Sequence, residues 1–180
     1  MGNYRRWTLI FFTCFLIFLS CAQAQAPKIT IKAEKIEYSL KEQITRSYGT
    51  AEKPVLVTYN DWELAGSQVL WDEKADLVVV EGRVKVVRKD ETPLVITCSQ
   101  LRFWPRSERF EAKGSVVVER GEVKATAGLL TGNGKEIVLT EKPLLLQEGQ
   151  RISGKSITFS TSQEKILVED AFVEVEAGER

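Results

Sequence analysis

The stretch Val80-Glu81-Gly82-Arg83-Val84-Lys85-Val86 places a glycine in front of valines that alternate with a charged residue. Apolar residues at every second position predict a β-strand with one buried face. The same pattern returns in Ala112-Lys113-Gly114-Ser115-Val116-Val117-Val118. This recurrence indicates a chain assembled from tandem strand units.

A second motif precedes these strands and consists of a small residue, an aliphatic residue three positions later and an aromatic residue two positions after that. Gly66-Ser67-Gln68-Val69-Leu70-Trp71 and Cys98-Ser99-Gln100-Leu101-Arg102-Phe103 are clear examples. The motif begins at residues 33, 66, 98, 127 and 154, although the fourth copy has Gly132 in the aromatic position. The sequence therefore predicts an all-β domain of about five strand–turn–strand repeats. A small residue at the same place in every copy predicts a tight bend or a close backbone approach.

The glycine marker follows the aromatic residue by eleven positions in the first three copies, at Gly49, Gly82 and Gly114. Lys142 and Asp170 stand at the marker in the last two copies. Stacking the copies in one register aligns their apolar residues into ladders across the sheets. The residues expected in these ladders are Ile36, Tyr38, Val69, Trp71, Val84, Val86, Leu101, Phe103, Val116, Val118, Leu130, Leu144, Leu146, Ile157 and Phe159.

The composition argues against nucleic-acid binding and against catalysis. Lysine plus arginine number 25 and aspartate plus glutamate 25, so the chain has no overall basic field. It contains no histidine, which removes Ser–His and Cys–His nucleophile pairs and histidine-based zinc sites. Cys98 stands at a small-residue position, which favours a buried structural thiol. We therefore expect no enzyme, no metal and no cofactor. Weak calcium binding by Asp72, Glu73 and Asp76 is the alternative, without a recognised calcium-loop motif.

The first 24 residues are typical of a cleaved signal peptide. Arg5 and Arg6 precede an uncharged, mostly apolar run over residues 7–19, and Ala22-Gln23-Ala24 supplies the small-x-small cleavage pattern. Cleavage leaves a domain over residues 25–180 with 23 basic and 25 acidic residues. A retained membrane anchor and lipid attachment at Cys21 are the alternatives.

The repeat resembles the OstA-like repeat of the lipopolysaccharide-transport protein A (LptA) family over residues 28–176. The resemblance rests on the two glycine–valine stretches and the Cys98–Phe103 motif in register. It implies an open, twisted β jelly roll in the periplasm, whose ladder residues line a groove that binds the acyl chains of lipopolysaccharide. It also implies head-to-tail self-association and contacts with an inner-membrane C-type protein and an outer-membrane D-type protein. Gly132, Lys142 and Asp170 depart from the family pattern and leave the shape of the C-terminal part of the groove open.

Three alternatives remain open beside this expectation. The ladders could pack as an ordinary sandwich core rather than as a groove, so the chain could be a structural adaptor that binds no lipid. It could also be an anchored C-type relative. Arg83, Lys85, Lys113 and Arg120 could meet lipid phosphates at a groove edge or form a solvated outer face. Stacked repeats would finally leave two unpaired strand edges, near residues 29–33 and 171–176, where copies could join.

Overall fold

The structure is a computed structural model that describes residues 28–147, 149–160 and 165–175. In these residues the chain forms 16 β-strands and one short 3-10 helix, η2 (Pro105–Ser107), which confirms the predicted all-β class. No helix in the described part of the chain has the length and apolar character needed to cross a membrane. The signal peptide predicted over residues 1–24 lies outside the described residues and stays a prediction.

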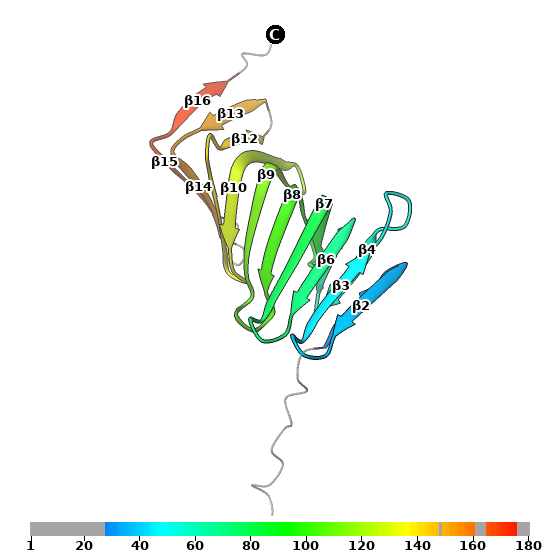
Figure 1. Ribbon diagram of the computed structural model, residues 1–180. Coiled ribbons are helices and arrows are strands. Elements are labelled where there is room, and N and C mark those ends of the chain that lie inside the picture. Colours follow the sequence, from blue (N-terminus) through cyan, green and yellow to red (C-terminus); the bar gives the residue numbers. More distant parts are fainter. Residues whose placement is uncertain (1–27, 148, 161–164, 176–180) are drawn as a thin grey trace, which may run out of the picture.

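The strands form two layers that share four long strands (Figure 1). The shared strands are β7 (Leu77–Arg88), β8 (Leu94–Trp104), β9 (Arg109–Arg120) and β10 (Val123–Gly132). The first layer adds β2 (Lys35–Ser39), β3 (Ile44–Tyr48), β6 (Gln68–Asp72), β11 (Glu136–Thr140), β14 (Ser156–Ser160) and β15 (Ile166–Glu169). The second layer adds β1 (Ile29–Lys32), β4 (Val55–Tyr59), β5 (Trp62–Gly66), β12 (Leu144–Gln147), β13 (Gln150–Ser153) and β16 (Phe172–Val175). All neighbours run antiparallel, so hairpins connect one repeat to the next.

The glycine markers are the points where long strands pass from one layer to the other. In β7 the pairing with β8 shifts between Glu81 and Val84, where Gly82 and Arg83 have φ angles of 77° and 52°. In β9, Gly114 and Ser115 have φ angles of 78° and 49°. Such a bulge bends a strand, and glycine adopts a positive φ without steric cost. The recurring glycine thus creates the fold line between the layers.

The serine that follows the small residue fastens this bend in two copies. The Ser67 hydroxyl donates a hydrogen bond to the Gly82 carbonyl oxygen at 3.2 Å, and Ser99 does the same to Gly114 at 3.2 Å. The small residue itself lies close to the neighbouring backbone: a Cβ on Gly66 would stand 2.9 Å from the Glu81 carbonyl oxygen. At Gly154 the corresponding distance to the Glu169 carbonyl oxygen is 2.5 Å. The predicted close backbone approach is confirmed at these two copies.

The core lies between the layers, where their apolar faces meet. Tyr59 and Trp62 from the second layer pack on Phe103 and Phe110 from the first, with ring centroids 5.3 to 6.1 Å apart. All four are at most 3% exposed. Contact between large aromatic rings of facing layers closes the interior at this point.

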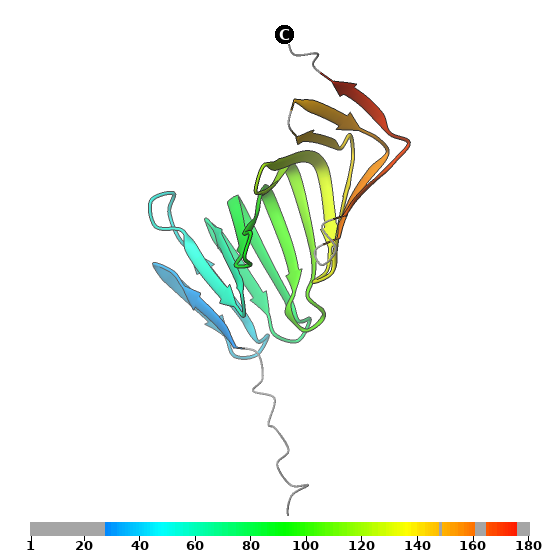
Figure 2. The same ribbon diagram turned by 180° about the vertical axis from the view of Figure 1, so that it is seen from behind.

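The sheet is open, and its free strands lie at opposite ends of the molecule (Figure 2). As predicted, β1 and β16 each have a single neighbouring strand. The same holds for β2 and β15, so each layer has a free edge at both ends. Unpaired edges of this kind can accept a further strand.

The alternation in β12 differs from the prediction. Leu144 and Leu146 were expected in the interior ladder, but Leu145 is the buried residue, at 1% exposure, and pairs with the interior residue Ala125. The preceding Glu141 and Lys142 both have a φ of 61°. A pair of left-handed residues also forms the bends at Gly82–Arg83 and Gly114–Ser115, so the bend of the fourth copy begins at Glu141, one position before the expected marker Lys142. A displacement of one position exchanges the faces of a strand. Leu144 and Leu146 are therefore half-buried on the outer face.

Candidate functional site

The interior ladder predicted from the sequence is deeply buried through the middle of the molecule. Nine of its members are at most 3% exposed: Val69, Val84, Val86, Leu101, Phe103, Val116, Val118, Leu130 and Ile157. Side chains packed at this density contact a ligand only when the two layers separate. Their contact with lipid remains a prediction, and in the structure described here they form the core.

The ladder becomes accessible at the N-terminal end. Ile36 and Tyr38 in β2 pair with Ser47 and Thr45 in β3, whose side chains are buried. Paired residues share a face, so Ile36 and Tyr38 point toward the interior. They are nevertheless 50% and 48% exposed, because β2 is an edge strand. Trp71 in β6, two strands further in, is partly buried against the core.

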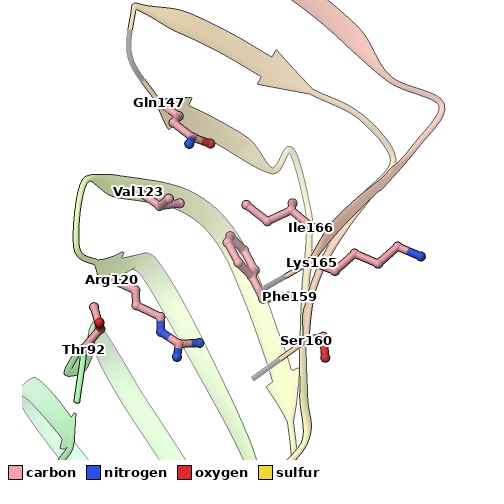
Figure 3. A pocket seen from close by; sticks show the side chains of 8 residues that line it. All are labelled: Thr92, Arg120, Val123, Gln147, Phe159, Ser160, Lys165 and Ile166. Carbon is pink, nitrogen blue, oxygen red and sulfur yellow. The ribbon is translucent and has the colours of Figure 1, made fainter. Parts of the chain in front are cut away.

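A pocket of about 440 Å³ opens between the layers at the C-terminal end (Figure 3). Its apolar wall consists of Val123 from β10, Phe159 from β14 and Ile166 from β15, all partly buried and packed against the core. The remaining lining residues are Thr92, Arg120, Gln147, Ser160 and Lys165. A volume in this range is typical of small-molecule sites, which span about 300–1,000 Å³. The pocket therefore continues the apolar interior out to solvent.

Only Phe159 of this lining was among the predicted groove residues. Val123 and Ile166 were missed as lining residues. Val123 could have been found, because it shares the alternation of Ala125 and Ala127, which are both buried in the same strand. Ile166 could not have been found in this way, because the sequence of residues 161–164 before it shows no alternation of apolar and polar residues.

The basic residues near the valine strands divide into two groups. Arg83, Lys85 and Lys113 are exposed on the outer face, as the solvated alternative predicts. Arg120 is half-buried and lines the pocket. It shares the alternation of Val116 and Val118, which places it on the inner face of β9.

Burial shifts the pKa of two titratable groups of the interior. Cys98 is 7% exposed, and burial raises the pKa of its thiol to about 11, so that it stays protonated at neutral pH. Burial also raises the pKa of Tyr59. Within the described residues no group of three or more Cys, Asp or Glu side chains stands where it could hold a metal ion.

No protein-family model matches the chain, and no curated protein matches it. Solved structures do match. One is the crystal structure of LptH from Pseudomonas aeruginosa, described as the LptA-homologous periplasmic component of the conserved lipopolysaccharide-transport device. It aligns with a TM-score of 0.45 and 15% sequence identity, over 83% of this chain and 95% of that chain.

Proposed function

We propose that this chain is a periplasmic carrier that binds lipopolysaccharide and shields its acyl chains between the inner and the outer membrane. The observation that carries the proposal is an apolar interior that runs between two layers and reaches solvent at both ends of an open sheet. Moving one methylene group out of water gains about 0.8 kcal/mol, so such an interior can hold acyl chains without polar contacts. The OstA-like register of the repeats supports the choice of lipid.

The same proposal makes the protein a binding and transfer component and not a catalyst. Nothing in the sequence resembles a nucleotide-binding loop, so transport would be driven by another protein. Export through the signal peptide and cleavage after Ala24 belong to the proposal. Sequencing the N-terminus of the protein recovered from the periplasm tests both: a start at Gln25 supports them, whereas an intact Met1 or a lipidated Cys21 points to a tethered relative.

The binding function is tested by purifying the exported chain from cells that make lipopolysaccharide and extracting it for mass spectrometry. Two neighbouring residues of β15 provide matched variants. Ile166 lines the pocket, whereas Leu167 is 53% exposed on the opposite face of the same strand. We expect Ile166→Asp to lose most of the bound lipid and Leu167→Asp to retain it.

Two outcomes would contradict the carrier function. The first is that no acyl lipid co-purifies with the folded wild-type chain or competes for a fluorescent lipid. The second is that Ile166→Asp and Leu167→Asp bind alike. Either result favours the structural adaptor, for which the deeply buried middle of the ladder is the specific support.

We further propose that copies associate head to tail, and that the free edges also contact the inner-membrane C-type and outer-membrane D-type proteins of the same pathway. Apolar side chains accompany the edges: Ile36 and Tyr38 at one end, and Val173 and Val175, 50% and 65% exposed, at the other. Joining unlike ends is a heterologous contact that builds open filaments. Light scattering during gel filtration should show a mass that rises with concentration and falls for Val173→Asp. A mass that stays monomeric at every concentration would contradict self-association.

A further inference from the structure

Two arginines occupy matching places on the inner face of the second layer. Arg88 ends β7 and Arg120 ends β9. Both pair with the same residue of the strand between them, Leu94 in β8. The repeat thus places the two cations at the same rim of the interior, on either side of β8.

Arg88 is fully partnered. Its Nε lies 3.3 Å from the Asp61 carboxylate and 3.3 Å from the Asp90 carboxylate. One terminal nitrogen donates to the Gly134 carbonyl oxygen at 3.3 Å, and the guanidinium stands 5.6 Å from the centroid of Trp62. Two carboxylates, a carbonyl and an aromatic face account for the charge of this side chain.

Arg120 has no such partners. None of the ion pairs within the described residues includes it, although it is half-buried. Figure 3 shows its guanidinium extending into the pocket beside Phe159, whereas the Lys165 ammonium group points away. A partly desolvated cation without a counter-ion is costly, and an anion in the pocket would remove that cost.

We propose that the C-terminal pocket binds one chain of an anionic amphiphile, whose charged oxygen head group pairs with Arg120 and whose tail lies on Val123, Phe159 and Ile166. The inference rests on the proposed carrier function and deepens it, because it places the charged head group of the lipid at the C-terminal end of the interior. Arginine suits this task, since its planar guanidinium can donate two parallel hydrogen bonds to a phosphate or a carboxylate. The apolar wall favours an occupant with an alkyl tail over a free inorganic ion.

The test compares two detergents with the same tail at concentrations below micelle formation, dodecyl phosphate and the uncharged dodecyl maltoside. Binding is measured by displacement of a fluorescent fatty acid from the chain that begins at Gln25. We expect the dissociation constant of dodecyl phosphate to be at least about tenfold lower than that of the maltoside. A charge-assisted hydrogen bond contributes a free energy that corresponds to a factor of this size. Arg120→Gln should abolish this difference in affinity, because it weakens the binding of dodecyl phosphate and leaves that of the maltoside unchanged. Arg83→Gln, an identical change at an exposed site on the outer face, should leave it intact.

Several results would overturn the inference. Equal affinity for the two detergents, or equal effects of Arg120→Gln and Arg83→Gln, would show that Arg120 selects no anion, while the carrier function would stand. Displacement by inorganic phosphate at the same concentration would indicate a plain anion site. If neither detergent binds but lipopolysaccharide co-purifies, the pocket is not where the lipid enters. If lipopolysaccharide is absent as well, the carrier function fails with the inference.

Discussion

The Tyr59 hydroxyl donates a buried hydrogen bond of 2.9 Å to the carbonyl oxygen of Pro105. Tyr59 ends β4 in the second layer, and Pro105 begins η2 directly after β8 enters the first layer. This polar contact joins the two layers beside the aromatic cluster. At the C-terminal end, in contrast, the pocket separates the layers. The layers are therefore joined beside the aromatic cluster and separated at the C-terminal pocket.

Tyr59→Phe should lower the free energy of unfolding by about 1 kcal/mol, the usual net value of one hydrogen bond. The Pro105 carbonyl oxygen would still accept from the Glu108 N–H at 3.2 Å, so no further loss is expected. Urea unfolding followed by tryptophan fluorescence measures the loss. Tyr48→Phe is the control, since the Tyr48 ring is only partly buried at the outer side of β3. Equal stability of the Tyr59 variant and the wild type would show that the contact does not hold the layers together.

Cys98 should react slowly in the folded chain and make the fold sensitive to alkali. Burial raises its pKa from 9.0 to about 11, so the reactive thiolate is about 100-fold scarcer at neutral pH than in the unfolded chain. Because the pKa is higher in the folded state, the stabilising contribution is complete below the unfolded value of 9.0 and is lost as the pH rises toward about 11.

A colorimetric thiol reagent measures this reactivity in the chain from Gln25, where Cys98 is the only cysteine. The rate should rise steeply when urea unfolds the protein. In Cys98→Ala the decline of stability between pH 9 and pH 11 should be shallower than in the wild type. A folded-state rate equal to that of the unfolded chain would mean that the interior beside β8 opens freely.

The bends at the glycine markers can be tested with two glycines of similar backbone conformation. Gly114 has a φ of 78°, and a Cβ there would stand 2.8 Å from the Ser99 Oγ and 2.9 Å from its Cβ. Gly149 has a φ of 76° and no atom within 4 Å of such a Cβ. Gly149→Ala should therefore cost about 1 kcal/mol of backbone strain alone, and Gly114→Ala distinctly more. Similar losses in urea unfolding would show that Ser99 yields to the new methyl group.

The sequence predicted the interior residues well where the repeat is regular. Val69, Leu101 and Ile157 follow the two-residue period in strands that begin after a small residue, and all are buried. The prediction for Leu144 and Leu146 is wrong in phase, because the left-handed pair of the fourth copy is Glu141 and Lys142, so that the bend begins one position before the expected marker Lys142. Alternation is a local signal, and a bend displaced by one residue reverses it.

Two features of the site could not be predicted from a local sequence pattern: the exposure of the ladder residues at the sheet edge, and which arginine is the candidate for binding a head group. Ile36 and Tyr38 have the correct phase but remain half exposed, since nothing in their own strand reports that it lies at a sheet edge. Arg88 and Arg120 share one phase in the sequence. Arg88 is paired with Asp90 from the turn that follows it and with partners from distant turns, among them Asp61. Which of two equivalent arginines is neutralised is decided by tertiary contacts.

These partners predict different effects on stability for the same substitution at the two arginines. Arg88→Gln would leave the Asp61 and Asp90 carboxylates without the cation that both contact, and the side chain is only 19% exposed. We expect a loss of about 1–3 kcal/mol, with Trp62 losing its stacked guanidinium as well. Arg120→Gln removes a half-buried charge that no carboxylate in the described part of the chain balances, so stability should stay within about 0.5 kcal/mol or rise. Thermal and urea unfolding of both variants provide the comparison. A loss at Arg120 as large as that at Arg88 would mean that Arg120 stabilises the fold and is not held ready for an anion.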